Sequence, residues 1–196
     1  MNYDKIINNR IDGGEIRYGV LFGNENIVFI KTGADGNIYG YKDKFLKMSH
    51  RIHERIGATV ICSSYPHTER SQADADKEMI SEIASELELS EYKVYFVGTS
   101  DGGYHILSLA ESVPQAVGLL CINPSFIDVE SFGNRLIDVS GIKKTLAFGS
   151  DDEDYDIIVP PVKNLKCDNL EIITIVGADH QFTGMLDKFI ALIDLL

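Results

Sequence analysis

The hydrophobic residues of this chain fall into short apolar runs that alternate with amphipathic stretches. Continuous runs rich in β-branched and aromatic residues are typical of strands buried on both faces of a sheet. These strand-like runs cover residues 26–30, 58–62, 93–97, 113–122, 144–148 and 170–176. Apolar residues spaced three or four apart predict amphipathic helices at 41–56, 74–89, 104–110 and 185–196. The alternation predicts an α/β fold, with a mainly parallel, doubly wound sheet and helices on both faces.

The N-terminal region departs from this alternation. Residues 4–9 and 15–22 are two strand-like runs, and Asp12, Gly13 and Gly14 form a turn signal between them. Glycine permits positive φ in such a turn, so the pattern predicts an antiparallel hairpin at one edge of the sheet. Later in the chain, residues 126–141 show no clean period and are expected to form loops, and 162–166 are expected to belong to a small helix.

Composition narrows the possible classes of protein. The chain has 196 residues, of which 44% are hydrophobic, so a single domain spanning 1–196 is expected. The net charge of −12 argues against a nucleic-acid partner and against binding to an anionic membrane. Neither an apolar segment of signal-peptide length nor a membrane-spanning run is visible, so a cytoplasmic protein is expected. Cys62, Cys121 and Cys167 lack metal-ligand spacing and are expected to be reduced thiols.

The stretch around Ser100 carries the most specific chemistry. A strand-like run ends in Gly98-Thr99-Ser100-Asp101-Gly102, and a helical pattern begins at once. A serine at the apex of a sharp strand-to-helix turn needs small residues two positions before and after it, which Gly98 and Gly102 supply. The segment resembles the nucleophile elbow of the α/β-hydrolase family, with an ordinary turn between strand and helix as the alternative. The resemblance implies that Ser100 is a nucleophile.

A serine nucleophile requires a histidine base and a carboxylate that orients it. In the resembled family both follow the serine, each after a sheet strand. His180 meets this condition, since it follows the strand at 170–176 and is the only histidine after His105. For the acid, counting from Gly149 favours Asp152, whereas the family's Val-Pro anchor selects Asp156, and Asp154 also remains possible. Asp152 is preferred because distance from the strand end fixes where a side chain projects.

The resemblance also implies an oxyanion hole built from backbone N–H groups. One donor would be Asp101, directly after the nucleophile, and the second would be Ala34 or Gly33 in the loop after the strand at 26–30. The family often carries His-Gly before this loop, whereas this chain has Lys31-Thr32, so the second donor stays open. The Asp101 carboxylate is expected to turn outward or to cap its helix.

The implied function is a serine hydrolase that cleaves carboxylic ester or thioester bonds, without a metal or organic cofactor. The substrate would be a small molecule, or an ester carried on a glycan or peptide. Acyl transfer, peptide cleavage and a non-catalytic binding role of the same fold are the alternatives. Residues 126–141 are too few for a cap domain, so an open site that accepts small acyl groups is expected. Candidates for its walls, with core packing as the alternative, are Tyr39, Tyr65, Tyr104 and Phe126.

The remaining histidines carry a weaker signal. His50 and His53 lie three residues apart on one predicted helix, a spacing that permits a metal pair. No third ligand stands beside them in the sequence, so solvated surface histidines are expected.

Overall fold

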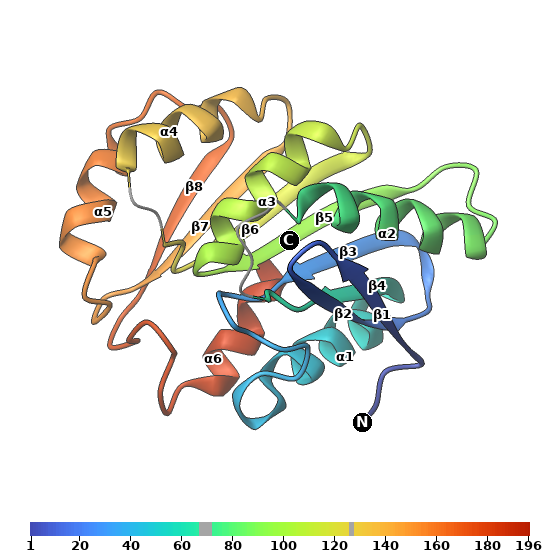
Figure 1. Cartoon of the computed structure of the whole chain (residues 1–196). Helices are drawn as coiled ribbons and strands as arrows, with labels where there is room; N and C mark the ends of the chain where they lie inside the picture. Colours follow the sequence, from blue (N-terminus) through green and yellow to red (C-terminus); the bar gives the residue numbers. More distant parts are fainter. Residues whose placement is uncertain (67–71, 126–127) are drawn as a thin grey trace.

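The computed structural model describes residues 1–66, 72–125 and 128–196, which share one eight-stranded sheet (Figure 1). The strand order is β1-β2-β4-β3-β5-β6-β7-β8. The strands are β1 (Lys5–Ile11), β2 (Gly14–Leu21), β3 (Asn24–Lys31), β4 (Ala58–Ser63), β5 (Lys93–Thr99), β6 (Ala116–Ile122), β7 (Lys143–Gly149) and β8 (Leu170–Ile175). Strands β3 to β8 pair in parallel, which confirms the expected α/β class.

The predicted N-terminal hairpin is also confirmed. Strands β1 and β2 pair antiparallel, with Ile11 opposite Gly14, and β2 continues antiparallel onto β4. Gly13 in the connecting turn has φ 90°, a conformation that glycine adopts without a steric penalty. The hairpin therefore closes one edge of the parallel sheet.

Helices cover both faces of the sheet (Figure 1). They are α1 (Lys44–Ile56), α2 (Ala73–Glu86), α3 (Asp101–Ser112), α4 (Val129–Asp138), α5 (Tyr155–Lys163) and α6 (Leu186–Ala191), with short 3-10 turns at Tyr41–Asp43 and Leu192–Leu195. Apolar residues of α2, α3, α4 and α5 share one buried cluster, and those of α1 and α6 share the other. Strand β3 serves both clusters, since Phe29 faces the first and Val28 the second. This double burial explains the continuous apolar runs of the strands.

Successive strands are added on opposite sides of β3, in the middle of the sheet. From β3 the chain passes through α1 to β4 on one side, and from β4 it passes through α2 to β5 on the other side of β3. The loops that leave the carboxyl ends of β3 and β5 therefore diverge and leave a crevice between them, which is where open α/β sheets bind ligands. Ser100 follows β5 and residues 32–40 follow β3, so the turn at Ser100 and the loop with the expected oxyanion donors meet at this crevice.

Three helical segments differ from the sequence-based expectation. Helix α1 begins at Lys44 rather than at residue 41, because Lys42 and Asp43 have positive φ, and Tyr41 is 71% exposed instead of buried. Residues 129–138 form α4 instead of a loop, with Asp128 accepting hydrogen bonds from the first-turn amides. Helix α5 ends at Lys163, so the small helix expected at 162–166 lies mostly upstream, and Pro160 and Pro161 lie inside it.

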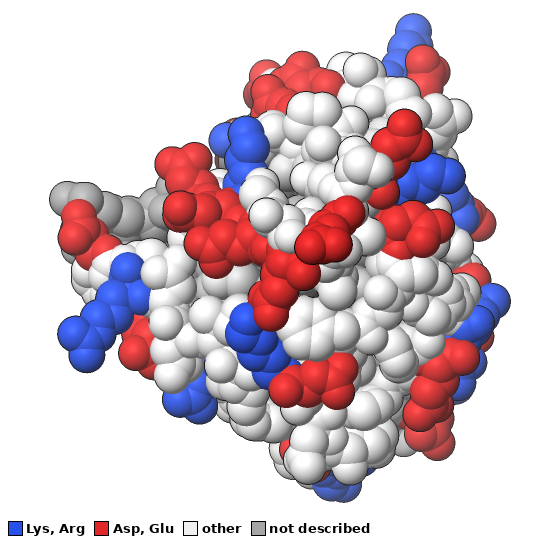
Figure 2. All heavy atoms as spheres, turned by 90° about the vertical axis from the view of Figure 1, so that its right-hand side faces the viewer, with Lys and Arg blue, Asp and Glu red and all other residues white. Residues whose placement is uncertain are grey.

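Helix α4 packs against α3 and α5, on the outer side of one helical layer. Within residues 1–66, 72–125 and 128–196 no cap domain is present. None of the helices described is long and apolar enough to cross a membrane. On the face shown in Figure 2, acidic side chains gather near the middle, whereas Lys and Arg lie mostly toward the rim. This face offers no extended positive surface of the kind that binds a phosphate backbone.

Candidate active site

Ser100 occupies a strained turn between β5 and α3. Its backbone has φ 53° and ψ −128°, far from the regions that residues with a Cβ prefer. The neighbouring glycines are required by close packing: a Cβ on Gly98 would lie 2.3 Å from the Gly102 carbonyl oxygen, and one on Gly102 would lie 2.3 Å from the Thr32 oxygen. The turn thus exposes the Ser100 hydroxyl at the carboxyl end of β5.

The structure brings His180 between Ser100 and Asp152. The distance from His180 Nε2 to Ser100 Oγ is 3.1 Å, and that from His180 Nδ1 to Asp152 Oδ2 is 2.7 Å. The Asp152 side chain is 5% exposed and that of His180 is 30% exposed. A carboxylate at Nδ1 fixes the tautomer that leaves Nε2 free to accept the Ser100 proton.

The other two candidate acids lie elsewhere in the same loop. The Asp154 amide donates to Asp152 Oδ1 at 3.0 Å, so Asp154 supports the orientation of Asp152 through its backbone. Asp156 lies in the first turn of α5 and is exposed. Neither carboxylate contacts His180, and counting from the end of β7 therefore identifies the residue that does.

Several backbone amides at the crevice have no hydrogen-bond acceptor among the described residues, including the three expected to donate to an oxyanion. These three belong to Gly33, Ala34 and Asp101, and all three residues line one cavity with Ser100. A Cβ on Gly33 would lie 2.9 Å from Ser100 Cβ, so the loop after β3 packs directly on the turn that carries Ser100. Unsatisfied N–H groups next to a serine hydroxyl are the donors that a developing oxyanion needs.

Two side-chain contacts of the Ser100 hydroxyl were not expected from the sequence. Ser125 Oγ, after β6, lies 2.9 Å from Ser100 Oγ, and the Asp101 carboxylate accepts from the Ser100 hydroxyl at 3.3 Å. The expectation that Asp101 turns outward or caps α3 is therefore wrong, since no side chain caps this helix. Ser100 has one proton to donate, so donation to His180 excludes donation to Asp101 and leaves Ser125 to donate toward Ser100.

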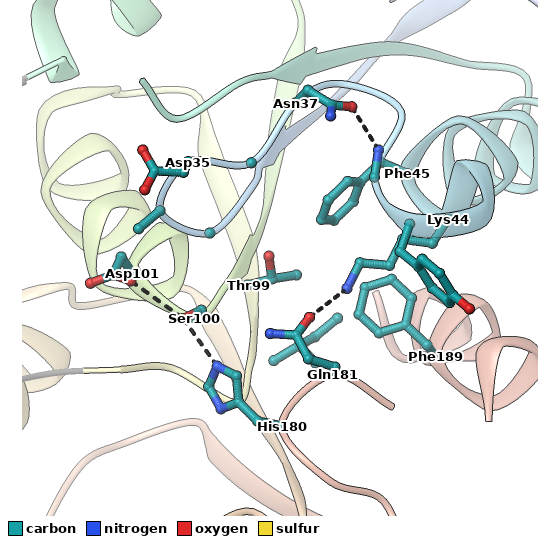
Figure 3. A pocket seen from close by; sticks show the side chains of 16 residues that line it. Asp35, Asn37, Lys44, Phe45, Thr99, Ser100, Asp101, His180, Gln181 and Phe189 are labelled. Atoms are coloured by element: carbon teal, nitrogen blue, oxygen red, sulfur yellow. Dashed lines mark hydrogen bonds between the residues drawn. The ribbon is translucent and has the colours of Figure 1, made fainter. Parts of the chain in front are cut away.

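The cavity beside Ser100 has a volume of about 300 Å³ (Figure 3). Its walls come from the loop after β3, the start of α1, the elbow and the segment around His180. Besides Ser100 and the three amides, it is lined by Asp35, Asn37, Tyr41, Lys44, Phe45, Gln181 and Phe189, among others. In Figure 3, Asp35 and Asp101 lie on one side of Ser100, and Lys44, Phe45 and Phe189 lie on the other.

Comparison with solved structures identifies the fold. Est1E from Butyrivibrio proteoclasticus superimposes with a TM-score of 0.73 at 14% identity, covering 97% of this chain and 96% of the other. An alpha-beta serine hydrolase homologue from Coxiella burnetii gives 0.72 at 14% identity, covering 100% and 99%. The chain has the α/β-hydrolase fold. The thioesterase domain from the curacin biosynthetic pathway is a further match, with 0.68 at 11% identity, covering 96% and 98%. No protein-family model and no curated protein sequence matches the chain.

Asn123 ties the two loops of this α/β-hydrolase fold that carry Asp152 and His180. Its side-chain amide donates to the backbone oxygens of Asp179 and His180 at 3.2 and 3.1 Å, and its oxygen accepts from the Gly149 amide at 2.7 Å. The residue is 2% exposed and has φ 41°, which asparagine tolerates better than most residues. Sequence reasoning passed over Asn123, whose position directly after a predicted strand was the one signal available in the sequence.

A second aspartate–histidine pair lies beneath the elbow. Asp76 of α2 is fully buried, and its carboxylate contacts Lys31 Nζ and His105 Nε2 at 2.8 Å each and Ser63 Oγ at 2.8 Å. The charged residues of an amphipathic helix are expected on its solvated face, and Asp76 departs from this expectation. Burial alone would raise the pKa of the Asp76 carboxyl, but Lys31 and His105 hold it below its ordinary value. Burial also lowers the pKa of His105.

The wall candidates and the surface histidines can now be placed. Tyr39 packs on Tyr3, Tyr65 on His105 and Tyr104 on Phe132, so these three side chains do not line the cavity around Ser100. Phe126 lies outside the described residues. His50 and His53 bind different backbone oxygens, those of Asn2 and Ala58. Among the described residues no cluster of metal-ligating side chains occurs.

Proposed function

We propose that the protein is a serine hydrolase that cleaves carboxylic ester or thioester bonds through an acyl-enzyme intermediate. The observation that carries this proposal is the hydrogen-bonded chain from Asp152 through His180 to Ser100, at 2.7 and 3.1 Å. It ends in a cavity lined by backbone amides without acceptors. Two solved structures with the same fold carry the descriptions serine hydrolase homologue and thioesterase domain, which adds support.

In this proposal Ser100 Oγ attacks the carbonyl carbon while His180 Nε2 accepts the hydroxyl proton. Asp152 keeps the Nδ1–H directed toward its carboxylate and stabilises the imidazolium that forms. The amides of Asp101 and of Ala34 or Gly33 donate to the oxyanion of the tetrahedral intermediate. His180 then gives its proton to the leaving oxygen or sulfur. A water molecule, deprotonated by His180, attacks the acyl-enzyme and releases the acid and the free Ser100 hydroxyl.

A fluorophosphonate probe tests this proposal directly. The probe should label the purified protein, and labelling should be lost in Ser100→Ala and in His180→Ala. Ser125→Ala is the matched control, because its hydroxyl lies 2.9 Å from that of Ser100 and no histidine of the described residues contacts it. Ser125→Ala should retain labelling. Absence of labelling in the wild-type protein would instead favour a binding protein with this fold, and equal labelling in Ser100→Ala would contradict Ser100 as the nucleophile.

The open cavity leads to an expectation about substrate size. Helix α4 packs on α3 and α5, and no described segment forms a domain over Ser100. The enzyme should therefore prefer small or accessible acyl groups, and its rate should rise smoothly with ester concentration through the solubility limit. A sharp increase when droplets form, or a strong preference for long-chain esters, would contradict an uncovered site.

A further inference from the structure

The cavity beside Ser100 has opposite charges at its two ends. Lys44 lies at one end with Phe45 and Phe189, whereas Asp35 and Asp101 lie at the other, and Ser100 stands between them (Figure 3). A cavity with one cationic end and one anionic end discriminates among substrates by where they carry charge. The proposed function, which treats the cavity only as a site for an ester group, does not use this polarity.

The ammonium group of Lys44 has unused hydrogen-bond donors. Its Nζ carries three donors, and its only hydrogen bond within the described part of the chain is to the neutral Gln181 Oε1, at 3.4 Å. No carboxylate of a described residue lies within ion-pair distance of Lys44. Its nearest anionic influence is Asp179, whose carboxylate is already engaged by the amides of Gln181 and Thr183. The ammonium group thus lacks an anionic partner at the cavity.

The surroundings hold this ammonium group at the cavity rather than in bulk water. Lys44 Nζ lies 5.3 Å from the centre of the Phe45 ring and 4.8 Å from that of Phe189. Aromatic faces attract a cation and restrict the flexible stem, so less conformational entropy is lost when a ligand binds. Lys44 is also the first residue of α1, so the helix N-terminus adds a positive partial charge at the same end.

We propose that the cavity selects esters that carry a carboxylate, and that Lys44 binds this carboxylate at the end of the cavity opposite Asp35 and Asp101. The proposal rests on the hydrolase function proposed above and specifies its substrate class. A carboxylate bound to Lys44 gains a charge-assisted hydrogen bond in a partly desolvated site. An ester with an anionic group at the other end would meet Asp35 and Asp101 and be disfavoured.

Two matched pairs of substrates test this selectivity. For the acyl side, the 4-nitrophenyl monoester of adipic acid is compared with the corresponding adipamide ester. For the alcohol side, 4-acetoxybenzoate is compared with 4-acetoxybenzamide. Each pair differs only by a carboxylate in place of a neutral carboxamide. In at least one pair the wild-type kcat/KM should be about three- to tenfold higher for the carboxylate, and the ratio should shrink between about 0.02 and about 0.5 M NaCl.

Variants of Lys44 test whether this residue causes the preference for the carboxylate substrate. Lys44→Met keeps most of the length of the side chain and its apolar packing on the two rings but removes the charge, so it should bring the ratio to about one. Lys44→Arg should preserve the ratio. Lys47→Met is the matched control on the same helix, since Lys47 bonds to the Lys42 oxygen and does not line the cavity. Thermal melting of each variant verifies folding.

The outcomes separate this inference from the hydrolase function. Hydrolysis that depends on Ser100, without a carboxylate preference or with a preference that survives in Lys44→Met, would overturn the inference alone. If no ester is hydrolysed, calorimetric binding of 4-acetoxybenzoate and 4-acetoxybenzamide to the Ser100→Ala protein still decides it. Tighter binding of the carboxylate, lost on adding Lys44→Met, supports the inference, and equal binding overturns it.

Discussion

The molecule contains two aspartate–histidine pairs in opposite surroundings. His180 and Asp152 are joined at 2.7 Å, and His105 and Asp76 at 2.8 Å, so the two contacts are nearly identical. The His180 side chain is 30% exposed and its second nitrogen faces the Ser100 hydroxyl at the cavity. The His105 side chain is 9% exposed, and its aspartate is shared with a fully buried lysine, Lys31.

The difference shows that the contact alone does not define a catalytic pair. Both pairs orient an imidazole, but only one directs it at a nucleophile beside open space. The buried pair instead joins three elements, because Lys31 ends β3, Asp76 lies on α2 and His105 lies on α3. Lys31 precedes the loop of Gly33 and Ala34, and α3 begins directly after Ser100. We therefore propose that the first pair acts in the chemistry and that the second holds the turn at Ser100 and this loop in place.

Removing the histidine from each pair should give the largest contrast. His180→Ala should reduce esterase turnover by about 10⁶-fold, and adding Ser100→Ala should hardly lower it further, because the two residues act as a unit. His105→Ala should retain most of the turnover per folded molecule. Steady-state kinetics with a soluble short-chain ester measure all of these variants, and circular dichroism measures the folded fraction. Losses that multiply in the double variant would contradict a shared role for Ser100 and His180.

The next effect concerns the acid of the exposed pair. Asp152→Asn should lower turnover by about 10⁴-fold, since an amide can stabilise the wrong tautomer of His180. Asp156→Asn is the control in the same loop and should have little effect, because its side chain is exposed on α5. The opposite ranking would transfer the orienting role to Asp156.

Breaking the buried pair should affect stability instead. Asp76→Ala leaves Lys31 as a buried charge without its partner and should lower the free energy of unfolding by about 3–5 kcal/mol. Combining it with Lys31→Met should recover much of this loss, because both charges are then absent. Urea denaturation measures the change. A loss below about 1 kcal/mol for Asp76→Ala would mean that water or rearrangement compensates Lys31.

Asn123 offers a smaller test of how the exposed pair is positioned. Asn123→Gly tolerates the positive φ but removes the bonds to the Gly149 amide and to the Asp179 and His180 oxygens. Turnover should fall by about 10²-fold, the usual penalty for misplacing reacting groups by about 1 Å. The KM for a small ester should change little. A variant with full kcat and lowered thermal stability would show a purely structural role.

The smallest effect is the pH dependence of stability that comes from His105. Burial lowers the pKa of folded His105 from its ordinary 6.5, so below pH 6.5 the unfolded chain binds a proton that the folded chain does not. The associated stability is complete above pH 6.5 and decreases as the pH falls toward the folded pKa, by at most about 1.4 kcal/mol per pH unit. His105→Gln should weaken this dependence in urea titrations at about pH 7 and about pH 5. An unchanged slope would contradict a neutral buried His105, whose ring contacts Asp76 and Tyr65 and whose charged form is opposed by Lys31.

Periodicity predicted the sheet and most helices because strands buried on both faces require continuous apolar runs. It missed α4, in which only Phe132, Gly133 and Leu136 are buried, so the apolar stripe is short. It also misplaced α5, which spans Tyr155–Lys163 and contains Pro160 and Pro161. Such local patterns cannot reveal that tertiary packing tolerates these prolines.

The residues that the structure brings together at Ser100 were found where a motif or a strand end marked them. Ser100, His180 and Asp152 each follow a strand, and this placement is readable in the sequence. Asn123, Ser125 and Lys44 were missed because their importance depends on contacts between segments far apart in the chain. Asp76 was misread for the same reason, since its burial requires Lys31 and His105 to meet it from two other elements.

The backbone conformation of Ser100 favours the proposed activity at the expense of thermal stability. Holding a non-glycine residue at φ 53° and ψ −128° costs about 1–3 kcal/mol of folding free energy. The conformation is unfavourable because Ser100 has a side chain, and this side chain is the proposed nucleophile. Glycine would relieve the strain and abolish the nucleophile at once. Selection for thermal stability alone would therefore tend to replace Ser100. Directed evolution of a more stable variant should measure turnover in every round.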